Sequence, residues 1–157
     1  MTTHQIIVRP ATLEDLPILL QFEQGIIEAE RPFDPTMQEG ELHHHDLPAI
    51  ISSPDAELLV AEFDERIVGC GYAQIRDAET YVRHTQYCYV GLIFVLREYR
   101  GMGINQAIIE ALKDWSRARN IFEMRLQVYD SNVRAKRAYE KTGFVPHMLV
   151  MRVDLSK

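Results

Sequence analysis

The first half of the sequence contains no lysine, and the first one is Lys113. Residues 1–65 carry fourteen acidic side chains against two arginines (net −12), whereas residues 66–157 carry nine acids and fifteen bases (net +6). An acidic first half disfavours nucleic acid and suits a cationic substrate, and a basic second half suits a polyanionic ligand. An acidic surface that serves solubility alone explains the first pattern equally well.

The sequence also lacks long hydrophobic runs and cysteine-rich motifs. No apolar run reaches the ~18 residues that span a membrane, and no basic region followed by an apolar stretch marks a secretory leader. We therefore predict a cytoplasmic protein without membrane contact. Cys70 and Cys88 lie in apolar, strand-like segments without metal-ligand spacing, so they are predicted to be buried thiols.

Hydrophobic periodicity in the 157 residues predicts one mixed α/β domain. Thr12 and Asp15 indicate a helix start, and Gly143 indicates a helix end. The expected elements are a strand at 6–8, a helix to about 29, a loop at 39–46 leading into a short helix, a hairpin of 57–63 and 66–76, a strand at 87–95, a helix at 105–118, a strand at 123–129, a helix at 133–142 and a last strand at 145–155.

The turn at residues 100–105 is the most informative motif, because an apolar strand precedes it and an amphipathic helix follows it. Gly101 and Gly103 let the backbone approach a ligand, and the unpaired N–H groups of a helix N-terminus attract an anion. Arg100 adds a full positive charge. The pattern predicts a phosphate or pyrophosphate site.

Residues 95–104 resemble the acyl-CoA pyrophosphate loop of the GNAT N-acetyltransferase superfamily. About thirty residues later, a second set resembles that family's Asn-x-x-Ala-x-x-x-Tyr-x-x-x-Gly-Phe signature: Asn132, Ala135, Tyr139, Gly143 and Phe144. Asn105 departs from the family, which usually has Gly or Ala there. The resemblance implies one domain over residues 4–157, with a central, mostly antiparallel sheet, a splayed pair of parallel strands and flanking helices.

The resemblance further implies an enzyme that moves an acetyl group from acetyl-CoA, or another short acyl-CoA, to a primary amine of a small molecule or a protein. The acidic half favours a cationic small molecule. A homodimer is one option, since dimers are common among such proteins, and no metal is expected. The implied cofactor-binding residues are Ile93, Phe94, Val95, Arg100, Gly101, Met102, Gly103, Ile104, Asn105, Gln106, Asn132, Ala135 and Tyr139.

Tyr139 is the expected partner of the leaving sulfur. Its phenol has an ordinary pKa near ~10 against ~8.5 for a thiol, so full proton transfer to the thiolate is uphill by roughly 2 kcal/mol. A hydrogen bond to charge that develops as the C–S bond breaks still favours the transition state.

The base that deprotonates the amine has no motif. A lysine-like amine has a pKa near ~10.4, so exposing its lone pair at pH 7 costs about 4.6 kcal/mol. Residues 87–95 contain no acid, and Tyr89 stands where many family members have a glutamate, so the resemblance makes it a candidate catalytic residue. Glu28 is the predicted base, with Glu79 and His84 as further candidates.

Two alternatives stay open from the sequence. The run His43-His44-His45-Asp46 invites a metal site, but adjacent loop residues rarely converge on one ion, so a polar loop on the acceptor side is the expectation. The missing strand acid and Asn105 also fit a non-catalytic acyl-CoA-binding or regulatory module. A nucleotide-binding protein is disfavoured because no Lys-Ser/Thr follows the glycines.

Overall fold

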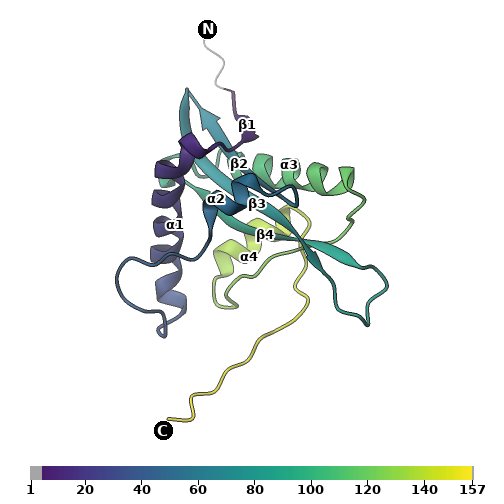
Figure 1. Cartoon of the computed structure of the whole chain (residues 1–157). Coiled ribbons are helices and arrows are strands. Elements are labelled where there is room, and N and C mark those ends of the chain that lie inside the picture. The colour runs from purple at the N-terminus through teal and green to yellow at the C-terminus, as the bar shows by residue number, and fades with distance from the viewer. Residues whose placement is uncertain (1–4, 157) are drawn as a thin grey trace. The chain divides into compact units, whose positions relative to one another are not determined.

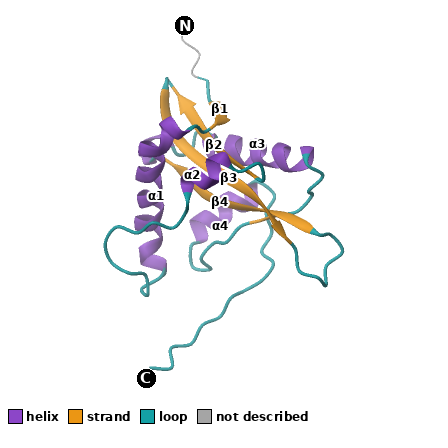
Figure 2. Ribbon diagram, viewed as in Figure 1, coloured by secondary structure: helices purple, strands orange, loops and turns teal. Residues whose placement is uncertain are grey.

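The computed structural model describes residues 5–156 and divides the chain into two compact units, one reaching to Gln127 and one starting at Val128. The first unit is built on a sheet of order β1-β2-β3-β4-β5, antiparallel except for the parallel pair β4–β5 (Figures 1 and 2). Its elements are β1 (Ile7–Pro10), the 3-10 helix η1 (Leu13–Asp15), α1 (Leu16–Glu30), the 3-10 helix η2 (Arg31–Phe33), α2 (Leu47–Ser52), β2 (Ala56–Phe63), β3 (Arg66–Asp77), β4 (Gln86–Val95), the 3-10 helix η3 (Arg97–Tyr99), α3 (Ile104–Ala118) and β5 (Met124–Arg125).

Helices cover both faces of this sheet. On one face, α1 and α2 bury Leu19, Phe22 and Leu47 against the sheet residues Leu58 and Leu92. On the other face, α3 buries apolar residues at helical spacing, including Ile104, Ile108 and Leu112. Among residues 5–156, no helix is long and apolar enough to cross a bilayer.

Glycine in β3 lets α3 approach closely. A Cβ added at Gly71 would lie 2.9 Å from a methyl carbon of Ile108, and one at Gly69 would lie 3.3 Å from side-chain carbons of Ile104 and Ile108. Both distances are shorter than ordinary van der Waals contact, so α3 packs directly on the backbone of β3.

The predicted hairpin is confirmed, and its turn explains its register. Asp64 and Glu65 connect β2 to β3 with φ of 52° and 64°, the left-handed pair typical of a two-residue hairpin turn. Aspartate tolerates this region better than most residues. The strands β2 and β3 pair along nearly their whole length as a result.

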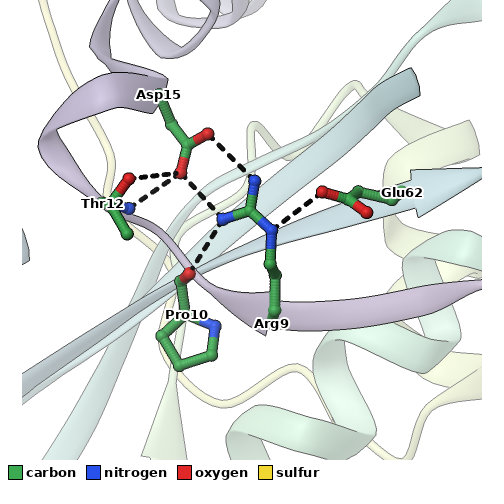
Figure 3. A network of polar contacts seen from close by, with 5 residues as sticks. All are labelled: Arg9, Pro10, Thr12, Asp15 and Glu62. Atoms are coloured by element: carbon green, nitrogen blue, oxygen red, sulfur yellow. Dashed lines mark hydrogen bonds and ion pairs between the residues drawn. The ribbon is translucent and has the colours of Figure 1, made fainter. Parts of the chain in front are cut away.

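Arg9 fastens the start of the chain (Figure 3). Its guanidinium makes two hydrogen bonds to the Asp15 carboxylate, at 2.9 and 3.0 Å, and one to Glu62 at 2.8 Å. The Asp15 carboxylate also accepts a hydrogen bond from the Thr12 backbone N–H, as the helix-start prediction required. The hydrogen bond from Arg9 holds the pKa of Asp15 below its ordinary value.

The second unit contains α4 (Val133–Lys141), which ends before Gly143 with φ of 102°, so the predicted left-handed helix end is confirmed. The predicted last strand is wrong: residues 145–155 form no strand, and their apolar side chains, including Val150 and Met151, are largely exposed. Alternating apolar residues favour a strand only where a neighbouring strand can pair with it. None of the described strands pairs with residues 145–155. The expected strand at 123–129 is likewise reduced to the two residues of β5.

Candidate functional site

The glycine turn lies at the start of α3, where the sequence predicts an anion site. Gly101 and Gly103 have φ of 80° and 83°, a region that only glycine adopts without strain. A Cβ added at either position would meet nothing within 4 Å, so open space lies beside the loop. The unpaired N–H groups of the first turn of α3, which starts at Ile104, provide partial positive charge at this loop.

Two side chains shape the loop further. Arg100 is exposed, and its Nε donates a hydrogen bond to the carbonyl oxygen of Val95 at 3.3 Å, so its charge lies next to the end of β4. Asn105 has its Oδ1 buried without a hydrogen-bond partner. An amide oxygen only accepts hydrogen bonds, so this atom suits a donor and not a phosphate oxygen.

β4 is irregular at its centre. Leu92 has φ of 55°, and the pairing with β3 slips between Cys70 and Tyr72, which defines a bulge. Bulges of this kind are common next to active sites. The Cys70 thiol donates a hydrogen bond to the carbonyl oxygen of Leu92 at 3.2 Å and thereby holds the bulge in place.

β4 and β5 also splay apart. Within the described residues, the two strands pair only at Cys88 and Tyr89, so residues 90–95 of β4 carry no ladder on that side. Phe94 and Val95 pair with β3 on their other side, and only the side that faces away from β3 can meet an extended ligand with amide groups. Binding of a pyrophosphate at the loop at 100–106 and of a pantetheine arm along this edge stays a prediction.

The remaining predicted ligand residues belong to the second unit. Asn132 is the N-cap of α4: its Oδ1 accepts a hydrogen bond from the Ala135 backbone N–H at 3.1 Å, so a capping role is established for the oxygen. Tyr139 is half-buried, and its ring lies edge-on to Phe144 with centroids 6.0 Å apart. The roles of Asn132, Ala135 and Tyr139 in catalysis or binding stay predictions.

The three residues predicted as candidates for the base all form ion pairs. Glu28 is 67% exposed and binds Arg31 at 2.8 Å. Glu79 and Glu123 both bind Arg125, and His84 binds Glu123. The hydrogen bond from Arg125 lowers the pKa of Glu79, which makes it a weaker base.

Tyr89 lies on the same sheet face as α2. The Arg76 guanidinium stacks over its ring at 3.9 Å, and burial raises its pKa. A phenol with a raised pKa is protonated at neutral pH, so Tyr89 can donate a hydrogen bond there but cannot accept a proton.

The structure adds one pair that the sequence reasoning missed: Glu23 and His45. The Glu23 side chain is 1% exposed, and its Oε2 lies 3.0 Å from the His45 Nδ1. Glu23 lies at helical spacing with the buried residues Leu19 and Ile27. The sequence did carry a signal for this pair: Glu23 lies on the apolar face of an amphipathic helix. A buried acid requires a partner, so this position indicates that another polar group contacts it.

The histidine run does not form a metal centre in the part of the chain that is described. His43 and His45 both point at Glu23, while the ring of His44 is exposed. Across residues 5–156, no group of three His, Cys, Asp or Glu side chains is arranged to hold a metal ion.

The comparisons with known proteins agree with this geometry. The family model described as "Acetyltransferase (GNAT) family" matches residues 24–144, which include the splayed strand, the glycine loop and α4. No curated protein matches the sequence.

Solved structures match over nearly the whole chain. A variant of the BH1408 protein from Bacillus halodurans has 22% identity and a TM-score of 0.86, covering 95% of this chain and 99% of that one. A predicted acetyltransferase from Clostridium acetobutylicum, solved with acetyl-CoA, has 18% identity and a TM-score of 0.72, with 96% and 97% covered. An aminoglycoside 6'-N-acetyltransferase from Acinetobacter haemolyticus has 17% identity and a TM-score of 0.74, with 96% and 99% covered. With its sheet, its glycine loop and a family match over most of its length, the chain belongs to the GNAT acetyltransferase family.

Proposed function

We propose that the protein transfers an acetyl group from acetyl-CoA to a primary amine by direct attack of the amine on the thioester. The glycine loop beside the open edge of β4 is the observation that carries this proposal. A helix N-terminus and Arg100 suit the pyrophosphate. At residues 93–95 the β5 side of β4 has no paired strand, which suits the arm that carries the thioester.

The acceptor is proposed to be a small cationic amine. Residues 1–65, which include α1 and the loop before α2, have a net charge of −12. Such a field raises the local concentration of a cationic substrate. Aminoglycosides are acceptors of this chemical class, and one structural neighbour is an aminoglycoside acetyltransferase.

Binding of acetyl-CoA is tested first, by thermal unfolding with and without the ligand. We expect wild type to be stabilised, and Arg100→Ala to lose at least half of that stabilisation because its charge lies at the loop. Arg97→Ala is the matched control, since Arg97 is an exposed arginine on η3. Wild type that is not stabilised by acetyl-CoA would refute the proposal.

Turnover is tested by following CoA release with spermidine, kanamycin and lysine amide. Tyr139→Phe is expected to lower kcat about tenfold or more with an unchanged KM for acetyl-CoA, because its hydroxyl acts on the leaving sulfur. Binding without turnover across this panel, with no effect of Tyr139→Phe, would instead support a non-catalytic acyl-CoA-binding module. The absence of an acid in residues 87–95 is the observation that favours this second candidate.

A further inference from the structure

We propose that His45 is the base that takes the proton from the acceptor amine, and that the buried Glu23 positions it. This assignment rests on the proposed acetyl transfer. It concerns residues of the first unit only, in which α1, the loop before α2, β3 and β4 meet.

The carboxylate of Glu23 fixes the His45 ring. Its Oε2 lies 3.3 Å from the backbone nitrogen of His44, 3.0 Å from that of His45 and 3.0 Å from the His45 Nδ1. The proposal takes the Glu23 carboxylate as the acceptor in this contact, which places the proton on the His45 Nδ1. The lone pair of a neutral ring is therefore on Nε2. This carboxylate–imidazole arrangement is the one that prepares a histidine to act as a base.

The burial of the two groups differs in the way that this role requires. The Glu23 side chain is 1% exposed, so water does not compete for it, whereas the His45 side chain is 20% exposed. His45 lines a cavity of about 340 Å³. A small amine can reach the ring there, while the carboxylate behind it, on α1, is buried. The cavity is lined by His44, His45, Asp46, Ala49, Ile50, Ser53, Tyr72, Gln74 and Arg76.

The cavity lies against β3, which contributes Tyr72, Gln74 and Arg76 to its lining, and Tyr72 links it to the centre of β4. The His45 ring meets the edge of the Tyr72 ring with centroids 5.6 Å apart. Tyr72 in turn lies directly on Gly91, where an added Cβ would come within 2.6 Å of the tyrosine hydroxyl. A side chain at residue 91 would displace Tyr72, so glycine is required for this packing.

Gly91 immediately precedes the bulge at Leu92 and the open edge at residues 93–95. A CoA arm that starts at the loop at 100–106 and follows Val95, Phe94 and Ile93 runs toward Gly91. The thioester at the far end of the arm is thereby brought toward the Tyr72 side of the sheet, where His45 lies. Glu28, the base predicted from sequence, is instead exposed and paired with Arg31.

The proposed step balances in atoms and charge. The acceptor enters as an ammonium group and gives one proton to the His45 Nε2. The freed nitrogen lone pair forms a bond to the thioester carbonyl carbon, and the C–S bond breaks with its electron pair on sulfur. The second proton of the nitrogen neutralises the thiolate, and the proton on His45 passes to water. The sum is ammonium plus acetyl-CoA giving amide, CoA thiol and one proton.

The tautomer of His45 is the first test, and it needs no acceptor. In the full-length, uniformly ¹⁵N-labelled protein at pH 8, long-range ¹H–¹⁵N NMR is expected to show the Nδ1–H form, assigned by loss of the signal in His45→Gln. An Nε2–H form, or the averaged mixture of a free imidazole, would overturn the proposal.

Kinetics with the best acceptor of the panel are the second test. We expect His45→Gln to lower kcat about 100-fold or more with an unchanged KM for acetyl-CoA, in line with the usual contribution of a general base. His43→Gln is the matched control: His43 lies on the same loop, 3.5 Å from the Glu23 Oε1, and does not line the cavity. It is expected to stay within twofold of wild type.

The pH dependence of kcat/KM distinguishes a positioning role of Glu23 from a purely structural one. Glu23→Gln removes the charge that stabilises the protonated ring, so the acid limb of kcat/KM is expected to move to lower pH. A structural role would instead lower kcat/KM by the same factor at every pH. The other titratable and charged groups around the ring are His43, His44 and Asp46 beside it, Tyr72 and Arg76 from β3 and Tyr89 from β4.

The outcomes distinguish the two proposals. An active wild type with an active His45→Gln variant overturns the assignment of the base and leaves acetyl transfer intact. Loss of kcat in Glu28→Gln alone would assign the base to Glu28 and overturn His45. A wild type that binds acetyl-CoA but transfers nothing to any amine overturns the proposed function and the base with it.

Discussion

The first unit holds one histidine–glutamate pair that is buried on its glutamate side, Glu23 with His45, and one that is exposed on both sides, Glu123 with His84. Glu23, on α1, is buried, and one of its carboxylate oxygens takes part in three hydrogen bonds. The side chains of Glu123 and its partner His84 are 35% and 46% exposed. A buried carboxylate has lost its water and depends on its protein partners, but an exposed one exchanges them for water at little cost. The buried Glu23 therefore fixes the orientation of the His45 ring. The exposed Glu123 and His84 form an ion pair that contributes little to the structure.

The largest expected difference between the pairs is in stability. Glu23→Ala leaves three donors without their acceptor and opens a cavity under α1, so we expect a loss of about 2–4 kcal/mol in the free energy of unfolding. Glu123→Ala is expected to lose less than about 1 kcal/mol because its ion pairs are screened by solvent. Urea unfolding of both variants measures the difference, and equal losses would contradict the comparison.

The packing under His45 can be broken without touching either pair. Gly91→Ala places a Cβ against the Tyr72 ring, so we expect a loss of about 1–3 kcal/mol. Adding the same change to Tyr72→Ala should cost clearly less, since the obstructing ring is gone. A double-mutant cycle measured by urea unfolding gives this coupling. If the losses of the two single variants simply add, the contact with the Tyr72 ring is not the reason that residue 91 must be glycine.

The smallest expected effect is the acid sensitivity of the exposed pair. Hydrogen bonds from Arg125, and then from His84, lower the pKa of Glu123. A carboxylate with a lowered folded-state pKa stabilises the fold above its ordinary pKa near ~4.3, and this contribution is lost as the pH falls through the lower value. Arg125→Gln should therefore flatten the stability profile between about pH 5 and 3 more than His84→Gln does. For both variants the change in the free energy of unfolding should stay below about 1 kcal/mol, measured by urea unfolding at each pH.

Local chemistry explains how much of the fold the sequence predicts. The hairpin turn at Asp64 and Glu65, the helix end at Gly143 and the glycine loop at Gly103 all depend on neighbours within a few residues, and their prediction was correct. The strand at 145–155 was predicted wrongly because its existence depends on a partner strand, which alternation does not identify.

The site divides in the same way. The loop that we propose for the pyrophosphate is local, so the glycines at 101 and 103 predict its backbone conformation. The bulge at Leu92 was not predictable, because leucine rarely adopts a positive φ and only the packing around it enforces this value. The contact of Glu23 with His45 joins residues 22 positions apart, and spacing alone does not show that it forms.

Burial of the two thiols has a practical consequence for measuring this chemistry. Cys70 and Cys88 are both 0% exposed, and burial raises the pKa of each thiol. Thiol-reactive dyes attack the thiolate, so neither cysteine of the folded chain should react at neutral pH. A colorimetric assay that reports free thiol should therefore count released CoA alone, with no background from the protein, and any slow protein-derived colour would itself report unfolding.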